Sequence, residues 1–154
     1  MADFFADSSV LVKRHVNEIG SNWFRALADP RTGNVIITAR VSIIEVYSAF
    51  NRRRREASLS FNDYAQLAGD FALISGAEYQ MVEFTAAVVG HARVLLERHP
   101  LRAYDAIQLA SASVAGEALV ADGLAEPIFL AADDRLLDAA RAEGMVVDNP
   151  NLHP

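Results

Sequence analysis

Four acidic residues are placed so that an alternating strand and helix chain would gather their carboxylates in one pocket: Asp7, Glu45, Asp105 and Asp133. Asp7 follows the apolar run at residues 4–6, and Asp133 follows the apolar run at residues 128–131. Carboxylates a few ångströms apart repel one another, so the cluster makes sense chiefly if it holds a divalent cation. Hard cations such as Mg²⁺ and Mn²⁺ prefer oxygen ligands. These residues therefore predict a metal-dependent enzyme that cuts phosphodiester bonds.

Strands and helices alternate along the chain and would position these acids. Short apolar runs predict strands at residues 4–6, 35–38, 79–84, 128–131 and 145–147. Capped or amphipathic segments predict helices from Ser8 onward and at residues 40–55, 61–75, 85–98, 102–118 and 134–143, the third of these six ending at Gly76. Such alternation implies right-handed crossovers and a mostly parallel sheet with helices on both faces. Ligands of such sheets bind beyond the carboxyl ends of the strands, where Asp7 and Asp133 fall.

Length and composition restrict the class of protein. The chain has 154 residues, of which 52% are hydrophobic and 22% are charged, so disorder is excluded and one domain spanning residues 1–154 is expected. The absence of cysteine excludes disulfides, thiolate nucleophiles and Cys-based zinc sites. No signal peptide is recognisable, and no apolar run approaches the roughly 20 residues of a membrane span. The expected compartment is therefore the cytoplasm.

The net charge of −6 is unusual for a protein that acts on nucleic acid, because phosphate binding normally uses a basic surface. Clustered carboxylates account for much of this excess, and a bound cation locally reverses its sign. The basic residues are also concentrated at one place, in a run of four: Arg52, Arg53, Arg54 and Arg55. This run either forms a solvated helix end or binds RNA phosphates or an acidic partner segment.

Asp7 and Glu45 each have alternative interpretations. Asp7 precedes Ser8 and Ser9 and is a candidate helix N-cap, a role that can coexist with metal binding. Glu45 lies in the middle of an expected helix among apolar residues, where an unpaired buried carboxylate is costly. Three roles stay open for Glu45: its side chain faces solvent, pairs with an arginine, or binds a metal ion.

The two later acidic positions also have structural explanations. Asp105 lies in the first turn of an expected helix, where an acid stabilises the helix by about 0.3–1 kcal/mol. Its apolar neighbours nevertheless indicate that it faces inward. Asp133 and Asp134 both open a helix, and we favour Asp133 as the metal ligand and Asp134 as a supporting residue behind it.

Other catalytic motifs are missing from the sequence. Lys13 is the only lysine and is not part of a G-x-x-x-x-G-K motif, which excludes a P-loop, and no G-x-S-x-G motif occurs. The four histidines show no metal-ligand spacing, so we interpret them as surface or packing residues. An aspartyl-phosphate at Asp7 is disfavoured because Ser9 stands where a D-x-D-x-T motif has its second aspartate.

Four segments together carry a family resemblance that spans most of the chain. They are F-F-A-D-S-S-V-L-V-K near the N-terminus, S-I-I-E-V-Y-S-A-F at 42–50, L-R-A-Y-D-A-I-Q-L-A-S-A at 101–112 and F-L-A-A-D-D-R-L-L at 129–137. In this order they resemble the PIN-domain ribonucleases, specifically the VapC-type toxins of toxin–antitoxin pairs. The resemblance implies a three-layer α/β/α sandwich with a mostly parallel sheet of four to five strands. It also implies a Mg²⁺ or Mn²⁺ site made by Asp7, Glu45, Asp105 and Asp133, with Ser9 as a supporting hydroxyl.

The resemblance further implies an endoribonuclease that hydrolyses RNA, a small antitoxin partner and a homodimer. This chain departs from the family at one position, since members often carry Thr or Ser two residues before the fourth acid and Ala131 stands there. A hydrogen bond behind the metal site is therefore expected to be missing. Ala131 leaves open a second hypothesis, a catalytically weak PIN-fold module that acts by binding RNA or a protein.

Overall fold

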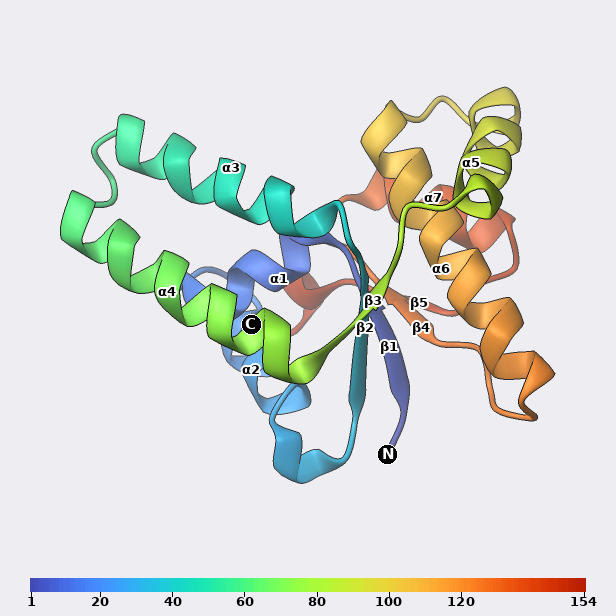
Figure 1. The fold of residues 1–154 in the computed structure, drawn as a ribbon, viewed down its shortest axis with the longest axis horizontal. Helices are drawn as coiled ribbons and strands as arrows, with labels where there is room; N and C mark the ends of the chain where they lie inside the picture. The colour runs from blue at the N-terminus through green and yellow to red at the C-terminus, as the bar shows by residue number, and fades with distance from the viewer.

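The computed structural model describes all 154 residues, which form a central parallel sheet between two layers of helices (Figure 1). Its five strands are β1 (Asp3–Ala6), β2 (Val35–Ala39), β3 (Tyr79–Val82), β4 (Ile128–Leu130) and β5 (Val147–Asp148). They pair in the order β3-β2-β1-β4-β5, and every pair is parallel. The predicted α/β/α sandwich with a mostly parallel sheet is confirmed.

Seven α-helices and one short 3-10 helix connect the strands, and a second 3-10 helix follows β5. The α-helices are α1 (Ser8–His15), α2 (Ser21–Leu27), α3 (Ser42–Arg55), α4 (Phe61–Glu78), α5 (Ala86–Arg98), α6 (Ala103–Ala121) and α7 (Asp134–Ala142). The 3-10 helices are η1 (Pro30–Thr32) and η2 (Pro150–Leu152). No helix is long and apolar enough to cross a membrane.

Three details differ from the expected elements. Helix α2 was not predicted, because Gly20 precedes it and no side chain caps its first turn. The expected helix end at Gly76 is wrong: α4 continues through this exposed glycine to Glu78 and leads directly into β3. The last strand lies slightly later than residues 145–147, because Val147 and Asp148 are the residues that pair with Phe129 and Leu130 of β4.

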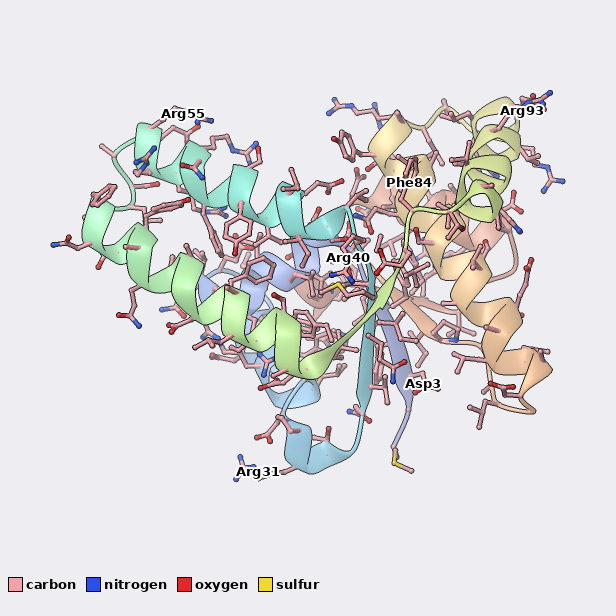
Figure 2. All side chains as sticks on the ribbon, in the orientation of Figure 1. Asp3, Arg31, Arg40, Arg55, Phe84 and Arg93 are labelled. Carbon is pink, nitrogen blue, oxygen red and sulfur yellow. The ribbon has the colours of Figure 1, made fainter.

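Alternating side chains of the strands face two separate cores. Phe5 and Phe129 stack with ring centroids 5.7 Å apart and pack under α5, α6 and α7. Ala6 and Leu130 point to the opposite face, which is covered by α1 to α4. Helices α3 and α4 extend together beyond the sheet as a helical hairpin (Figure 1). Side chains fill both cores, while residues such as Arg31 and Arg93 project from the outer surface (Figure 2).

The strand order creates a switch point at β1. From β1 the chain moves outward to β2 and β3 and then crosses to β4 on the other side of β1. Connections therefore diverge between β1 and β4, and open sheets bind ligands outside the carboxyl ends of their strands at such points. The residues that directly follow β1 and β4 are thus in the position where a ligand site is expected.

Candidate active site

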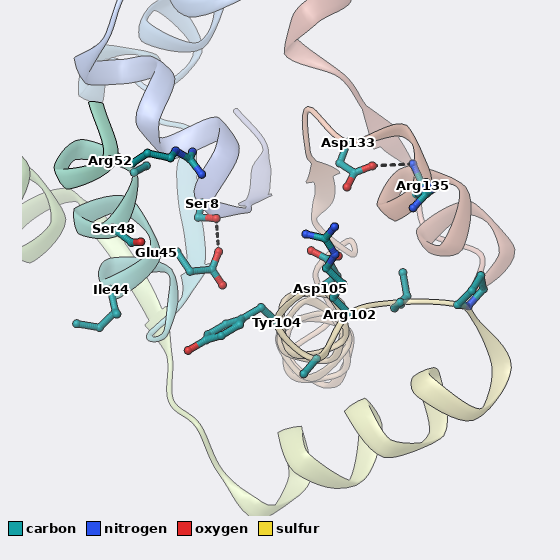
Figure 3. A pocket seen from close by; sticks show the side chains of 14 residues that line it. Ser8, Ile44, Glu45, Ser48, Arg52, Arg102, Tyr104, Asp105, Asp133 and Arg135 are labelled. Carbon is teal, nitrogen blue, oxygen red and sulfur yellow. Dashed lines mark hydrogen bonds between the residues drawn. The ribbon is translucent and has the colours of Figure 1, made fainter. Parts of the chain in front are cut away.

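A cleft of about 660 Å³ opens at the carboxyl edge of the sheet. One wall is α3, the other is the start of α7, and the first turn of α6 forms the floor (Figure 3). Three acids and three arginines line this cleft: Glu45, Asp105, Asp133, Arg52, Arg102 and Arg135. The structure thus brings three of the four predicted acids to one cleft.

Asp7 lies buried behind the cleft, with 5% of its surface exposed. Its carboxylate caps α1 by accepting from the Val10 backbone N–H at 3.1 Å and from the Ser9 hydroxyl at 2.6 Å. Burial raises the pKa of Asp7 to about 7, since these two hydrogen bonds only partly offset the loss of water. The charges of Glu45 and Asp105 raise this pKa further. Asp7 is therefore a helix cap in an electrostatic environment that favours its neutral form.

Glu45 has one carboxylate oxygen with a donor and one without. The Ser8 hydroxyl donates to Oε2 (Figure 3), whereas Oε1 is buried and has no hydrogen-bond partner. Burial raises the pKa of Glu45 and the charge of Asp105 adds to this rise, while the nearby Ser8 hydroxyl and Gln108 amide lower it. That amide donates to Ser42 at 2.8 Å and makes no hydrogen bond to Oε1. Of the three roles left open by the sequence, the arginine pair is not formed, and Glu45 is a partly buried residue that lines the cleft with Oε1 buried. An unpartnered buried oxygen is unfavourable and needs an explanation, which a bound cation would supply.

Asp105 lies on the floor of the cleft, and Asp133 lies on the wall made by the start of α7 (Figure 3). Asp105 is half-buried in the first turn of α6, where burial and the charge of Asp133 raise its pKa and Arg102 acts against them. Asp133 caps α7 by accepting from the Arg135 backbone N–H at 2.9 Å (Figure 3). Asp134 instead accepts from the Asn149 side chain at 3.0 Å and does not line the cleft. The geometry therefore favours Asp133 as the acid that acts in the cleft and shows no contact by which Asp134 supports it.

Ser9 connects Asp7 to the loop that carries Asp133. Besides donating to Asp7, its hydroxyl accepts from the Ala132 backbone N–H at 3.1 Å. The Ala131 side chain has no polar atom and is fully buried in the core under α6 and α7. The loop before Asp133 is therefore held through the Ser9 hydroxyl and a backbone N–H, with no contribution from a hydroxyl at position 131.

The arginine run does not act as one unit. Arg52 lines the cleft, but Arg53 pairs with Glu18 at 3.3 Å, and the Arg54 guanidinium lies 5.1 Å from the centre of the Tyr64 ring. Arg55 is exposed at the end of α3, outside the cleft. Of the four arginines predicted to bind RNA or a partner, Arg52 is therefore the one that lines the cleft. The sequence reasoning missed Arg102 and Arg135, although each lies within three residues of an acid in the cleft.

A buried network of hydrogen-bonded side chains joins α3 to α6, and it was not predicted from the sequence. The Ser42 and Gln108 side chains are hydrogen-bonded at 2.8 Å, and the Thr38 hydroxyl lies 2.9 Å from that of Ser42 and 2.7 Å from the Ala6 carbonyl oxygen. Ser42 lies one turn before Glu45, and Gln108 lies one turn after Asp105. This hydrogen-bond network therefore fixes α3 and α6, the two helices that carry Glu45 and Asp105, relative to each other and to the end of β1.

Replacing Gln108 by Leu should destabilise the protein by about 1–3 kcal/mol, because Ser42 loses a buried hydrogen-bond partner. The free energy of unfolding in urea measures this loss. The control is Ser113→Ala on the same helix, whose hydroxyl bonds only to the Leu109 carbonyl of its own helix at 3.2 Å. Equal stability of the Gln108 variant and the control would show that the buried hydrogen-bond network does not hold α3 against α6.

The donor atoms around the cleft suit a hard divalent cation. All side-chain donors of the four acids, Ser8 and Ser9 are oxygens, and Mg²⁺ and Mn²⁺ select such ligands over sulfur or imidazole. No three acidic or histidine side chains are arranged to hold one ion in this conformation. A site without three converging ligands is still compatible with Mg²⁺, because this ion usually keeps several waters and binds proteins through only one or two carboxylates.

The fold and the acid-lined cleft are those of a PIN domain, and the model of the PIN domain family matches residues 4–141. The chain belongs to this family, as its motifs predicted. It is similar to Ribonuclease VapC45 from Mycobacterium tuberculosis (strain CDC 1551 / Oshkosh), with 32% identity over 150 residues that cover 97% of both chains.

Solved structures share this fold at low sequence identity. The chain is similar to Mycobacterium tuberculosis VapC20, described as a toxin that cleaves the sarcin-ricin loop, with a TM-score of 0.61 at 18% identity and 98% and 99% of the two chains covered. A toxin–antitoxin complex from Klebsiella pneumoniae matches with a TM-score of 0.60 at 14% identity, covering 96% and 97% of the two chains. The predicted PIN fold is thereby confirmed.

Proposed function

We propose that this protein is a Mg²⁺- or Mn²⁺-dependent endoribonuclease that hydrolyses RNA phosphodiester bonds, and that it is the toxin of a toxin–antitoxin pair. The buried, unpartnered Oε1 of Glu45 beside the other acids is the observation that carries this proposal. Membership of the PIN family and the name of the VapC45 relative support it. A divalent cation bound at this site would activate water and neutralise charge that develops on the phosphate.

The residues of the chain divide into three roles in this proposal. One or two of the carboxylates of Asp7, Glu45 and Asp105 would contact the cation directly and the rest would hold it through its waters, and Asp133 would position the attacking water. Ser8 orients Glu45 through its hydrogen bond to Oε2, and Ser9 orients Asp7. The arginines that line the cleft bind RNA phosphates on either side of the cut: Arg52, Arg102 and Arg135. These arginines balance the three acids that line the cleft, and a bound cation would make the cleft positive, which would let a chain with a net charge of −6 hold a polyanion.

A nuclease assay on mixed RNAs tests the proposed activity. Wild-type protein should cleave RNA internally with Mg²⁺ or Mn²⁺ and should lose this activity in EDTA. Absence of cleavage under all metal conditions, for a protein that is folded by circular dichroism, would favour the catalytically weak binding module. Ala131 is the feature of the sequence that favours this second function.

The partner assignments rest on the family resemblance and on the shared fold with a toxin–antitoxin complex. We propose a small antitoxin that places an Arg or Lys side chain among the carboxylates, a homodimer, and action in the cytoplasm. Wild-type protein expressed alone should slow growth, and co-expression of its antitoxin should restore it. Sedimentation of the purified chain measures the dimer, and a monomer at micromolar concentration would contradict that part of the proposal.

Arg52 is the member of the arginine run that should contact RNA. Arg52→Gln should weaken RNA binding and flatten the slope of log affinity against log salt by about 0.7, the value for one phosphate contact on a single strand. Arg55→Gln removes the same charge from the exposed end of α3 and is the matched control. If both variants change affinity and slope equally, Arg52 acts through general charge and has no phosphate contact in the cleft.

A further inference from the structure

Two large apolar side chains are exposed in the cleft beside the acids. Tyr104 lies in the first turn of α6 with 55% of its surface exposed, and Ile44 lies on α3 with 66% exposed. Both line the cleft, and the Tyr104 ring projects from the floor toward the wall that carries Ile44 (Figure 3). These two side chains give this part of the cleft, the slot, apolar surface next to a site made of charged groups.

Tyr104 differs from the other three tyrosines of the chain, each of which packs within the protein. Tyr47 makes an edge contact with Phe71 at 5.3 Å, and Tyr64 and Tyr79 lie beside the guanidinium groups of Arg54 and Arg14. Tyr104 forms no aromatic or cation–π contact of this kind. Its ring faces are therefore available to a ligand that enters the cleft.

We infer that Tyr104 and Ile44 hold one unpaired RNA base next to the phosphate that is cut. This inference rests on the proposed nuclease function and assigns Tyr104 and Ile44 as residues that position the base beside the cut. Tyr104 directly precedes Asp105, so a base stacked on its ring and a phosphate near the Asp105 carboxylate would belong to the same or adjacent nucleotides. The three arginines of the cleft favour a polyanion over an apolar peptide as the occupant.

The arrangement selects single-stranded RNA over a duplex. In an A-form helix the bases are stacked on one another and their faces are covered, so a tyrosine ring cannot reach them. Stacking on an aromatic side chain does not depend on the identity of the base, because every base has a π face. The slot therefore specifies an unpaired nucleotide without specifying a sequence.

Binding of a single-stranded oligonucleotide that carries 2-aminopurine tests the inference in buffer with EDTA, where no cleavage occurs. Tyr104→Ala should weaken binding by about 5-fold to 150-fold, the range measured when one base loses its aromatic partner. Tyr104→Phe keeps the ring and should stay within about twofold of the wild type. Phe84→Ala is the matched control, because Phe84 is 54% exposed but does not line the cleft.

Oligonucleotides with one abasic position locate the base. Wild-type protein should lose affinity most when the abasic position adjoins the bond that is cut in the presence of Mg²⁺, and Tyr104→Ala should show no such loss. If the wild type cleaves RNA but Tyr104→Ala binds as tightly as the wild type, the slot is a protein contact and the inference is overturned. If the wild type neither binds nor cleaves RNA, the proposed function itself fails.

Discussion

Asp7→Asn should lower RNA cleavage by at least about a hundredfold and at the same time stabilise the metal-free protein. Loss of a residue behind a metal site typically costs 10-fold to 100-fold in activity, and loss of a direct ligand should cost at least the upper end of that range. The Asn side chain still accepts hydrogen bonds from Val10 and Ser9, so the cap of α1 is retained. The variant therefore separates the charge of Asp7 from its structural role.

The gain in stability should depend on pH in a defined direction. Asp7 has an ordinary pKa of 3.8 in the unfolded chain and a pKa of about 7 in the folded protein, so the folded state binds this proton more tightly. Its contribution to stability is complete below about pH 4 and is lost as the pH rises to about 7. At about 1.36 kcal/mol per pKa unit, the full loss is roughly 4 kcal/mol. The Asn variant has no such loss.

The difference between variant and wild type at each pH is the quantity to measure, because His15 acts in the opposite direction. His15 is half-buried beside Phe50 and Phe71, and this partial burial lowers its pKa to about 4. Its contribution to stability is lost as the pH falls from about 6.5 to 4 and is common to both proteins. The His15 contribution cancels when the unfolding free energy of the wild type is subtracted from that of Asp7→Asn. This difference should grow from near zero at pH 4 to its maximum above pH 7.

Asp134→Asn is the matched control, since it removes a carboxylate at the same edge of the sheet but outside the cleft. It should retain cleavage and show no gain of stability with pH. Full activity of Asp7→Asn at matched metal concentration would remove Asp7 from the catalytic site. A stability difference that is independent of pH would show that Asp7 is charged in the folded protein without penalty.

The positions of Asp7 and Asp105 could be predicted from the sequence because they depend on neighbouring residues. Asp7 follows an apolar run and precedes two serines, and this pattern fixes both the strand end and the helix cap. Asp105 was predicted to face inward from its apolar neighbours alone, and it is half-buried in the cleft. In each case the chemistry of the site and the boundary of an element depend on neighbouring residues, which a single sequence displays.

Side-chain contacts between segments that are distant in the sequence could not be predicted from it, and these contacts determine the details of the site. Four consecutive arginines cover a full helical turn, so the sequence could not show that Glu18 would pair with Arg53 and leave Arg52 in the cleft. Ser42 and Gln108 are 66 residues apart, and each alone resembles an ordinary polar residue of a helix. Ile44 and Tyr104 likewise line one cleft only because α3 and α6 come together there.

Binding of Mg²⁺ or Mn²⁺ to the wild-type protein should weaken as the pH falls below about 7. A carboxyl group must lose its proton before it can hold a cation, and the folded protein keeps the Asp7 proton up to about pH 7. If one proton is displaced, apparent affinity should fall about tenfold for each pH unit below 7 and level off above it. The pKa values of Glu45 and Asp105 are raised as well and act in the same direction.

Thermal unfolding with increasing metal concentration measures this affinity without any nuclease assay. At a hundred times the dissociation constant the cation should stabilise the wild type by about 2.7 kcal/mol. Asp134→Asn should show the same stabilisation and pH dependence as the wild type, whereas Asp7→Asn should bind more weakly and lose the dependence near pH 7. Affinity that stays constant from pH 5 to 8 in the wild type would mean that the cation does not displace the Asp7 proton, so that Asp7 serves only as the cap of α1.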